Sequence, residues 1–293
     1  MRKNRNNVTR NISYSHSAVT RGGRAVIRIM ENATGRLRLI RRAKGYESEV
    51  ACGRDFWEVM TERYGLTLDV LNGTLDDIPR EGPLVVIANH PYGILDGLMM
   101  GRILSATRGD FRILAHQVFQ KAEELKRVIL PISFDESKEA VALNLETRKA
   151  AIGYLAEGGA IGIFPGGTVS TSARPFSEPM DPGWRSFTAR MIVKSQAQVV
   201  PIFFCGHNSR FFQVASHLHQ TLRVGLLIKE FRARVNKPVE VVIGKPIPRD
   251  ALQPLCGDAR AMMDFLRKET YALSPVPVRD LGYGFEFEDR YRH

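Results

Sequence analysis

Short apolar runs alternate with longer segments of helical periodicity through most of the chain. Six runs of five or six residues, rich in β-branched side chains, have the length and composition of buried strands. They are 84–88, 111–115, 128–132, 160–164, 199–204 and 239–243. Helical periodicity covers 97–107, 119–126, 137–156, 184–195 and 259–272. Strands that alternate with helices predict an α/β fold, in which a mainly parallel central sheet is flanked by helices on both faces.

The first 65 residues follow a different pattern. Residues 1–17 are polar and predict a disordered basic tail. Residues 18–44 have helical periodicity with an apolar side and many arginines, and 54–64 predict a second, strongly apolar helix. We therefore expect amphipathic N-terminal helices over 18–65, followed by one α/β domain over 66–293 that opens with an edge strand at 66–71.

The charge is concentrated in this N-terminal region. The chain carries a net charge of +11, and residues 1–45 hold twelve of its 42 Lys and Arg residues but one of its 31 acidic residues. The remainder is balanced, with 30 basic and 30 acidic side chains. A basic amphipathic helix of this kind is typical of an anionic membrane surface. An ordinary solvated helix is the alternative, and nucleic acid is disfavoured because no aromatic residues interleave the arginines.

The composition of the chain also bears on the location of the protein in the cell. We find no run of about 18 apolar residues and no apolar core of a signal peptide. Cys52, Cys205 and Cys256 lie far apart and are odd in number, which indicates neither a disulfide framework nor a cysteine metal site. These features predict a cytoplasmic protein that is peripheral on the inner face of the cell membrane.

A histidine and an aspartate follow the first buried strand of the sheet. His90 comes directly after the 84–88 strand, and Asp96 follows six residues later near the start of a helix. Ligands of open α/β sheets bind at this end of the strands. A carboxylate that fixes the imidazole tautomer leaves the other ring nitrogen free to take a proton, so the pair indicates a general base. The alternative is that His90 belongs to a turn and Asp96 caps the helix.

Two further strands end in comparable turns. The 160–164 strand runs into Pro165-Gly166-Gly167-Thr168-Val169-Ser170, where glycines let backbone N–H groups approach a developing negative charge. A simple turn is the alternative. The 199–204 strand carries Val200-Pro201 and leads to Asn208-Ser209-Arg210-Phe211-Phe212, in which Arg210 is a candidate for binding a polar head group.

Together these three strand ends resemble the glycerolipid acyltransferase superfamily, which includes the lysophosphatidate acyltransferases. That family carries Asn-His-x4-Asp, Phe-Pro-Glu-Gly-Thr-x-Ser and a later Val-Pro, in this order. The resemblance implies acyl transfer from a thioester to a hydroxyl, with His90 as general base and Asp96 orienting it. The predicted substrate-binding residues are Asn89, Tyr92, Gly166, Gly167, Thr168, Ser170 and Arg210.

Two departures from the family pattern matter. Five residues rather than four separate His90 from Asp96, which is similar to a branch often labelled hemolysin-like. Gly166 stands where the family has a glutamate associated with the glycerol-phosphate acceptor. The second departure favours a lyso-aminolipid over lysophosphatidate as the acceptor.

We therefore expect a lysolipid O-acyltransferase whose donor is an acyl carrier protein or CoA thioester, and which needs no metal or redox cofactor. Lipid or thioester hydrolysis is a second possibility, although a Gly-x-Ser-x-Gly elbow is absent from the sequence. A membrane-binding scaffold with a degenerate site is the third.

Overall fold

The computed structural model describes residues 13, 20–121, 123–133 and 137–287. The predicted basic tail, residues 1–17, lies outside the described residues apart from Ser13. No described helix combines the length and the apolar character needed to cross a bilayer.

Four helices open the described chain: α2 (Arg21–Thr34), α3 (Arg36–Ala43), α4 (Tyr46–Ala51) and α5 (Phe56–Tyr64). The helical segment expected over 18–44 is divided at Gly35, whose φ of 127° suits glycine alone among common residues. The short α4 was not predicted, because six residues carry too little periodicity.

A seven-stranded sheet forms the centre of the molecule in the order β1-β9-β8-β2-β5-β3-β4. Its strands are β1 (Thr67–Asn72), β2 (Leu84–Ala88), β3 (Arg112–His116), β4 (Ile129–Ile132), β5 (Ala160–Ile163), β8 (Gln198–Phe204) and β9 (Pro238–Ile243). The five strands from β8 to β4 run parallel, whereas β9 is antiparallel to β8 and β1 runs parallel to β9. The predicted α/β fold with a mainly parallel sheet is confirmed, with β1 at an edge.

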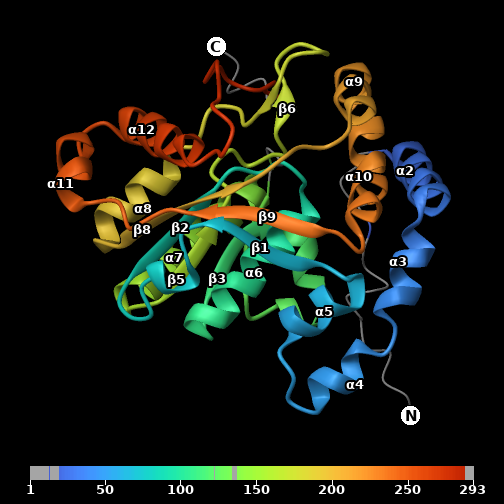
Figure 1. The fold of residues 1–293 in the computed structure, drawn as a ribbon, viewed down its shortest axis with the longest axis horizontal. Coiled ribbons are helices and arrows are strands. Elements are labelled where there is room, and N and C mark those ends of the chain that lie inside the picture. Colours follow the sequence, from blue (N-terminus) through green and yellow to red (C-terminus); the bar gives the residue numbers. More distant parts are fainter. Residues whose placement is uncertain (1–12, 14–19, 122, 134–136, 288–293) are drawn as a thin grey trace.

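The remaining elements connect and cover these strands (Figure 1). The helices are α6 (Ile94–Arg108), α7 (Lys138–Ala156), α8 (Phe187–Ser195), α9 (Arg210–Leu218), α10 (Gln220–Arg234), α11 (Arg249–Leu252) and α12 (Ala259–Ala272). A small hairpin pairs β6 (Thr171–Ser172) with β7 (Pro179–Met180). The helix expected over 119–126 is wrong: 3₁₀ turns occupy this region, and α9 and α10 were not predicted.

Both faces of β2 are buried, as its continuous apolar sequence requires. On β2, Leu84 and Val86 belong to one core with residues of α5, α6 and α10. Val85 and Ile87 belong to a second core with residues of α7, α8 and α12. The end of β2, from which His90 emerges, is therefore fixed from both sides.

The N-terminal helices pack directly onto this framework. α2 lies beside α10 (Figure 1), with Ile27 only 1% exposed and the Met30 side chain against Gly225. α5 places Trp57 against Gly101 of α6, the helix whose first turn contains Asp96. Residues of α3, α4 and α5 share one apolar cluster with strand residues, so these helices and the sheet have a common core.

Candidate active site

The three strands that carry the sequence motifs are neighbours in the sheet. β2 pairs in parallel with β5 on one side and with β8 on the other, so that Ile87 lies opposite both Ile163 and Pro201. Because carboxyl ends of parallel strands meet at one edge, the three motif loops gather there, where α/β proteins bind ligands.

His90 and Asp96 meet at this edge. The ring Nδ1 of His90 lies 2.9 Å from the Oδ2 of Asp96, whose side chain is fully buried. The same Oδ2 accepts hydrogen bonds from the backbone N–H groups of Tyr92 at 2.8 Å and Gly93 at 2.9 Å. Asp96 therefore caps α6 and contacts His90 at once. Gly93, with a φ of 88°, provides the sharp turn that the longer His-x5-Asp spacing needs.

Two contacts orient the imidazole of His90: Asp96 at the edge of the ring and Phe164 against its face. The ring of His90 stacks on Phe164 with centroids 4.2 Å apart and planes inclined by 23°. Its side chain remains 18% exposed although Nδ1 is buried, so the accessible part of the ring lies away from Asp96. With a proton on Nδ1, the other nitrogen, Nε2, carries the lone pair and can accept a proton from a bound hydroxyl.

The buried carboxyl of Asp96 is balanced between opposing effects. Burial raises its pKa, while the adjacent His90 and the two backbone N–H groups act to lower it, and the net direction is upward. Donors that converge on one oxygen offset part of the desolvation and hold the carboxylate in one position.

Asp181 is an organising residue that the sequence did not reveal. It is completely buried, and its carboxylate accepts from the His90 backbone N–H at 3.1 Å, the Ser170 hydroxyl at 2.5 Å and the Trp184 indole N–H at 2.9 Å. The Ser170 N–H also donates to the His90 carbonyl oxygen at 2.8 Å. Asp181 thus ties the first motif to the glycine-rich loop. Its Asp-Pro-Gly sequence resembles an ordinary turn, so only the tertiary structure identifies it.

A buried arginine from α10 fixes the rest of the glycine-rich loop. Arg223, 5% exposed, donates to the Thr168 hydroxyl at 2.7 Å, the Val169 carbonyl at 2.9 Å and the Thr171 hydroxyl at 3.1 Å. The hydroxyls of Thr168 and Ser170 therefore already have protein partners, and both residues shape the loop.

The two glycines of this loop differ in what they offer. The Gly167 N–H donates to the Phe164 carbonyl oxygen at 2.9 Å, so the loop's own turn occupies the group expected to face an oxyanion. A Cβ on Gly166 would lie 3.3 Å from the Cβ of Asp181 and 3.4 Å from its Cγ. A glutamate at this position would thus press against the Asp181 carboxylate.

The other predicted substrate-binding residues also lie at this edge and contact the backbone. Both side-chain amide atoms of Asn89 bond to the backbone of Phe204, at 3.0 Å and 2.7 Å, and join the ends of β2 and β8. The Tyr92 hydroxyl donates to the Cys205 carbonyl at 2.9 Å, and burial raises its pKa to about 12. Exposed Arg210 donates to carbonyls of the β6–β7 loop at 3.1 Å and 3.2 Å. Direct contact of these residues with substrate stays a prediction.

Among the residues that the structure describes, no group of three or more His, Cys, Asp or Glu side chains is placed to hold a metal ion. His90 and Asp96 form a pair rather than a ligand set. The chemistry that this pair can supply by itself is proton transfer.

Comparisons with known proteins find acyltransferases among the relatives of this chain. Two curated relatives, both named lyso-glycine lipid O-acyltransferase, come from Phocaeicola vulgatus and Bacteroides thetaiotaomicron. They are 26% and 25% identical over 209 residues, which cover 69% of this chain and 72% and 74% of theirs. A solved structure, the 1-acyl-sn-glycerophosphate (LPA) acyltransferase PlsC from Thermotoga maritima, covers 90% of this chain and 87% of its own, with 14% identity and a TM-score of 0.45.

The family model described as Acyltransferase matches residues 33–276, which is most of the chain and includes all three motif loops. The match begins within the N-terminal helices, in agreement with the core that they share with the sheet. This protein belongs to the Acyltransferase family.

Proposed function

We propose that the protein transfers a fatty acyl chain from an acyl thioester to the hydroxyl of a lysolipid, with a lyso-glycine lipid as the favoured acceptor. The carrying observation is the 2.9 Å contact between His90 Nδ1 and the buried Asp96 carboxylate, at the edge of the sheet where the three motif loops meet. A positioned imidazole that has no serine or cysteine nucleophile beside it suits activation of the acceptor itself.

In the reaction, His90 Nε2 removes the proton of the acceptor hydroxyl as its oxygen attacks the thioester carbonyl carbon. A tetrahedral intermediate forms, and its collapse breaks the carbon–sulfur bond and leaves an ester. The imidazolium then returns its proton to the departing thiolate. Asp96 keeps the Nδ1 proton in place and stabilises the transient imidazolium. The N–H groups of Gly166 and Thr168, rather than that of Gly167, are our candidates for stabilising the oxyanion.

Two observations support an aminolipid acceptor. Both curated relatives are named for a lyso-glycine lipid. Gly166 replaces the glutamate associated with a glycerol-phosphate acceptor, and a Cβ at this position would lie 3.3 Å from the Cβ of buried Asp181, so a longer side chain would crowd that carboxylate. The acceptor subsite is therefore built differently from that of the lysophosphatidate acyltransferases that the sequence resembles.

We place this reaction at the inner surface of the cell membrane, because the substrate is a lipid and the N-terminal helices are rich in arginine. Exposed Val26, Ile29 and Leu37 lie among these arginines on α2 and α3, as a peripheral membrane contact requires. The donor is an acyl carrier protein or CoA thioester from the cytoplasm.

The test is a reaction of purified protein with acyl-CoA or acyl carrier protein, with lyso-glycine lipid or lysophosphatidate as acceptor, followed by mass spectrometry. We expect the diacyl glycine lipid as the main product, and its loss in His90→Ala. Preferred acylation of lysophosphatidate would refute the acceptor assignment. Donor consumption that is independent of acceptor would indicate a hydrolase. Vesicle binding without turnover of any donor would indicate a scaffold.

A further inference from the structure

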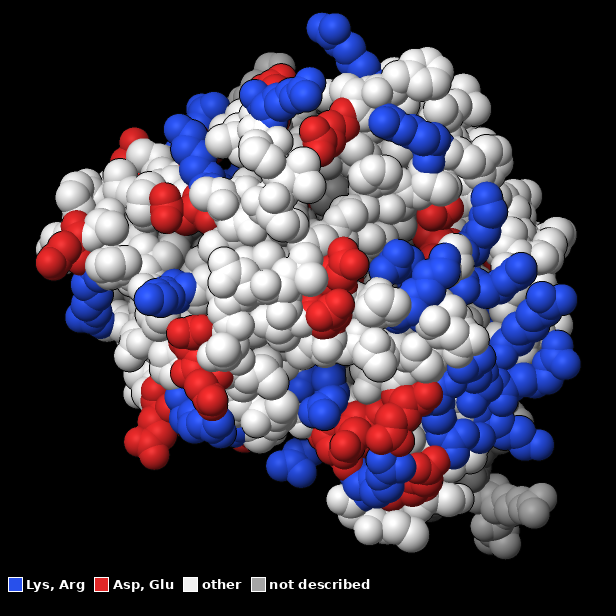
Figure 2. Space-filling model, in the orientation of Figure 1, with Lys and Arg blue, Asp and Glu red and all other residues white. Residues whose placement is uncertain are grey.

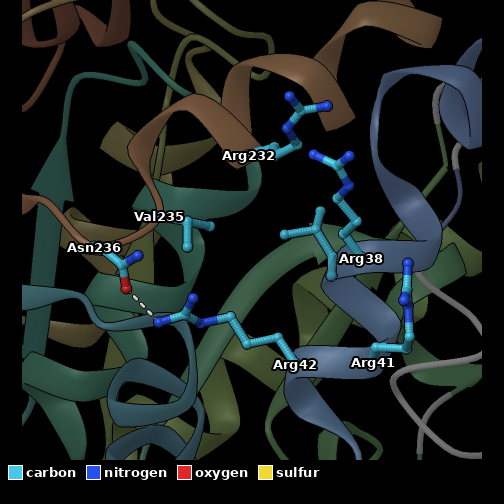
Figure 3. A pocket seen from close by; sticks show the side chains of 7 residues that line it. Arg38, Arg41, Arg42, Arg232, Val235 and Asn236 are labelled. Atoms are coloured by element: carbon cyan, nitrogen blue, oxygen red, sulfur yellow. Dashed lines mark hydrogen bonds between the residues drawn. The ribbon is translucent and has the colours of Figure 1, made fainter.

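A hollow lined by four arginines lies apart from the His90 site. It is formed between α3 and the end of α10, with a volume of about 540 Å³. Its lining residues are Arg38, Leu39, Arg41, Arg42, Arg232, Val235 and Asn236, which we call the arginine pocket. Figure 3 shows the guanidinium groups of Arg38 and Arg232 close to each other, although they come from different helices.

The positive charge of this pocket is not compensated by acidic neighbours. Within the described residues, no carboxylate forms an ion pair with any of the four arginines. Neutral oxygens position two of them: Arg42 donates to the Asn236 side chain and the Arg63 carbonyl, and Arg232 donates to the Thr34 carbonyl at 2.8 Å. Figure 2 shows basic residues gathered on this side of the molecule, whereas acidic residues cluster below them.

The pocket and the candidate active site lie along the same edge of the sheet. Asn236 closely precedes β9, which runs antiparallel to β8. Phe204 at the end of β8 pairs with Val241, so the first residues of β9 extend beyond that end of β8. Arg234, two residues before Asn236, places its guanidinium 5.1 Å from the centre of the Tyr92 ring. β9 is two strands from β2, which corresponds to about 10 Å across the sheet.

We propose that the arginine pocket is a discrete binding site for a phosphate group carried by an organic ligand. Guanidinium groups match the geometry of phosphate oxygens and bind them through paired hydrogen bonds. Buried Leu39 and partly buried Val235 add an apolar surface for the carbon part of the ligand. This phosphate comes either from the nucleotide end of a CoA thioester or from the head group of an anionic phospholipid. The site needs no proton transfer by His90.

Charge reversal tests the pocket with little structural risk. Arg38 and Arg41 are exposed, and Arg41 has only a long 3.5 Å bond to the Leu37 carbonyl. The test protein is the double variant Arg38→Glu/Arg41→Glu. Its matched control is Arg148→Glu/Arg260→Glu, which makes the same change in net charge on exposed positions of α7 and α12. Thermal unfolding curves recorded by circular dichroism check that both variants are folded.

Two binding measurements separate the sources of the phosphate. One is calorimetric titration with CoA, and the other is sedimentation with vesicles of phosphatidylglycerol in phosphatidylcholine, compared with phosphatidylcholine alone. We expect at least one of these ligands to bind, and the pocket variant to weaken that binding about tenfold or more, while the control stays within about twofold. A saturating one-to-one titration in the CoA arm assigns the pocket to the donor, and loss in the vesicle arm alone assigns it to the bilayer.

Equal weakening in both double variants would overturn the proposal, because it would show a response to total charge alone. Absence of binding in both arms would also overturn it. Repeating the titrations with His90→Ala separates this proposal from that on the reaction, since binding should survive where turnover is lost. If the pocket variant is less stable than the control, Arg38→Lys retains the charge but not the paired donors, and unweakened binding in this variant would contradict a guanidinium site.

Discussion

Charged groups are treated in opposite ways at the candidate active site and at the arginine pocket. Asp96 and Asp181 are fully buried. Backbone N–H groups of the turn before α6 donate to Asp96, whereas the donors to Asp181 come from His90, Ser170 and Trp184. Arg38 and Arg41 are exposed, and no described carboxylate pairs with them. A buried charge is tolerated only when its partners are fixed, whereas water solvates an exposed charge until a ligand arrives.

The buried charges of the candidate active site fix the positions of the reacting groups, whereas the exposed charges of the arginine pocket are available to bind a ligand. The buried carboxylates hold backbone and imidazole in one arrangement, as proton transfer demands. The exposed arginines are free to meet an anion, at a modest and salt-dependent gain in free energy. The two regions should therefore respond differently to substitution and to ionic strength.

Replacement of His90 by alanine should produce the largest effect on activity. Loss of the general base should lower kcat/KM by about 10²- to 10⁴-fold. Because the side chain is partly exposed and its backbone bonds remain, the unfolding midpoint should change little. Steady-state kinetics and thermal unfolding of the same preparation check both expectations. Full activity in the variant would remove His90 from the mechanism.

Asp181→Ala should have the largest effect on stability. The substitution leaves three donors without their acceptor, at about 1–3 kcal/mol each, so we expect a loss of at least about 3 kcal/mol in the free energy of unfolding. Urea unfolding measures the loss. Asp250→Ala, at an exposed position of α11, is the matched control and should change stability by less than about 0.5 kcal/mol. Similar values for both would contradict the organising role of Asp181.

A methyl group on Gly101 should destabilise the protein to a smaller extent. A Cβ there would lie 2.2 Å from the Trp57 ring, and overpacking of this kind costs about 1–3 kcal/mol. Gly97→Ala on the same helix meets no atom within 4 Å, so it should be neutral or stabilise α6 by up to about 1 kcal/mol. Urea unfolding of the two variants compares them, and equal stability would argue against the packing of α5 on α6.

Salt should have the smallest effect, and it should act on one region alone. Raising ionic strength from about 0.05 M to about 0.5 M shortens the screening distance and should weaken phosphate binding by the arginine pocket. The contact between His90 and buried Asp96 is shielded from ions, so kcat at saturating substrate should remain nearly constant. Titration and kinetics at matched salt concentrations test this, and a parallel decline of both would erase the distinction.

The sequence predicted the parts of the fold that depend on regular apolar patterns. The six predicted runs correspond to β2, β3, β4, β5, β8 and β9, because apolar residues dominate each of these strands. The contact between His90 and Asp96 was also predicted, because the sequence places His90 just after the end of β2 and Asp96 in the first turn of α6.

Two of the missed features, α10 and Asp181, depend on buried charge. α10 buries Arg223 and Glu230 among its apolar residues, which blurs the periodicity that identifies a helix. Arg223 holds the glycine-rich loop, and Glu230 accepts from Ser209 at the start of α9. Asp181 was missed because its Asp-Pro-Gly sequence resembles an ordinary turn, and its contacts with His90 and Ser170 form only in the folded chain.

The packing of α2 on α10 decides how the N-terminal segment can be studied. Ile27 is almost completely buried, and the Met30 side chain packs against Gly225 of α10. Truncation before residue 45 would therefore expose the apolar surface of α10 on which α2 packs, in addition to removing the arginines. Loss of membrane binding in a truncated chain would therefore not distinguish the loss of the arginines from unfolding or aggregation. Single-site changes of charge on an otherwise intact chain are the informative way to dissect this region.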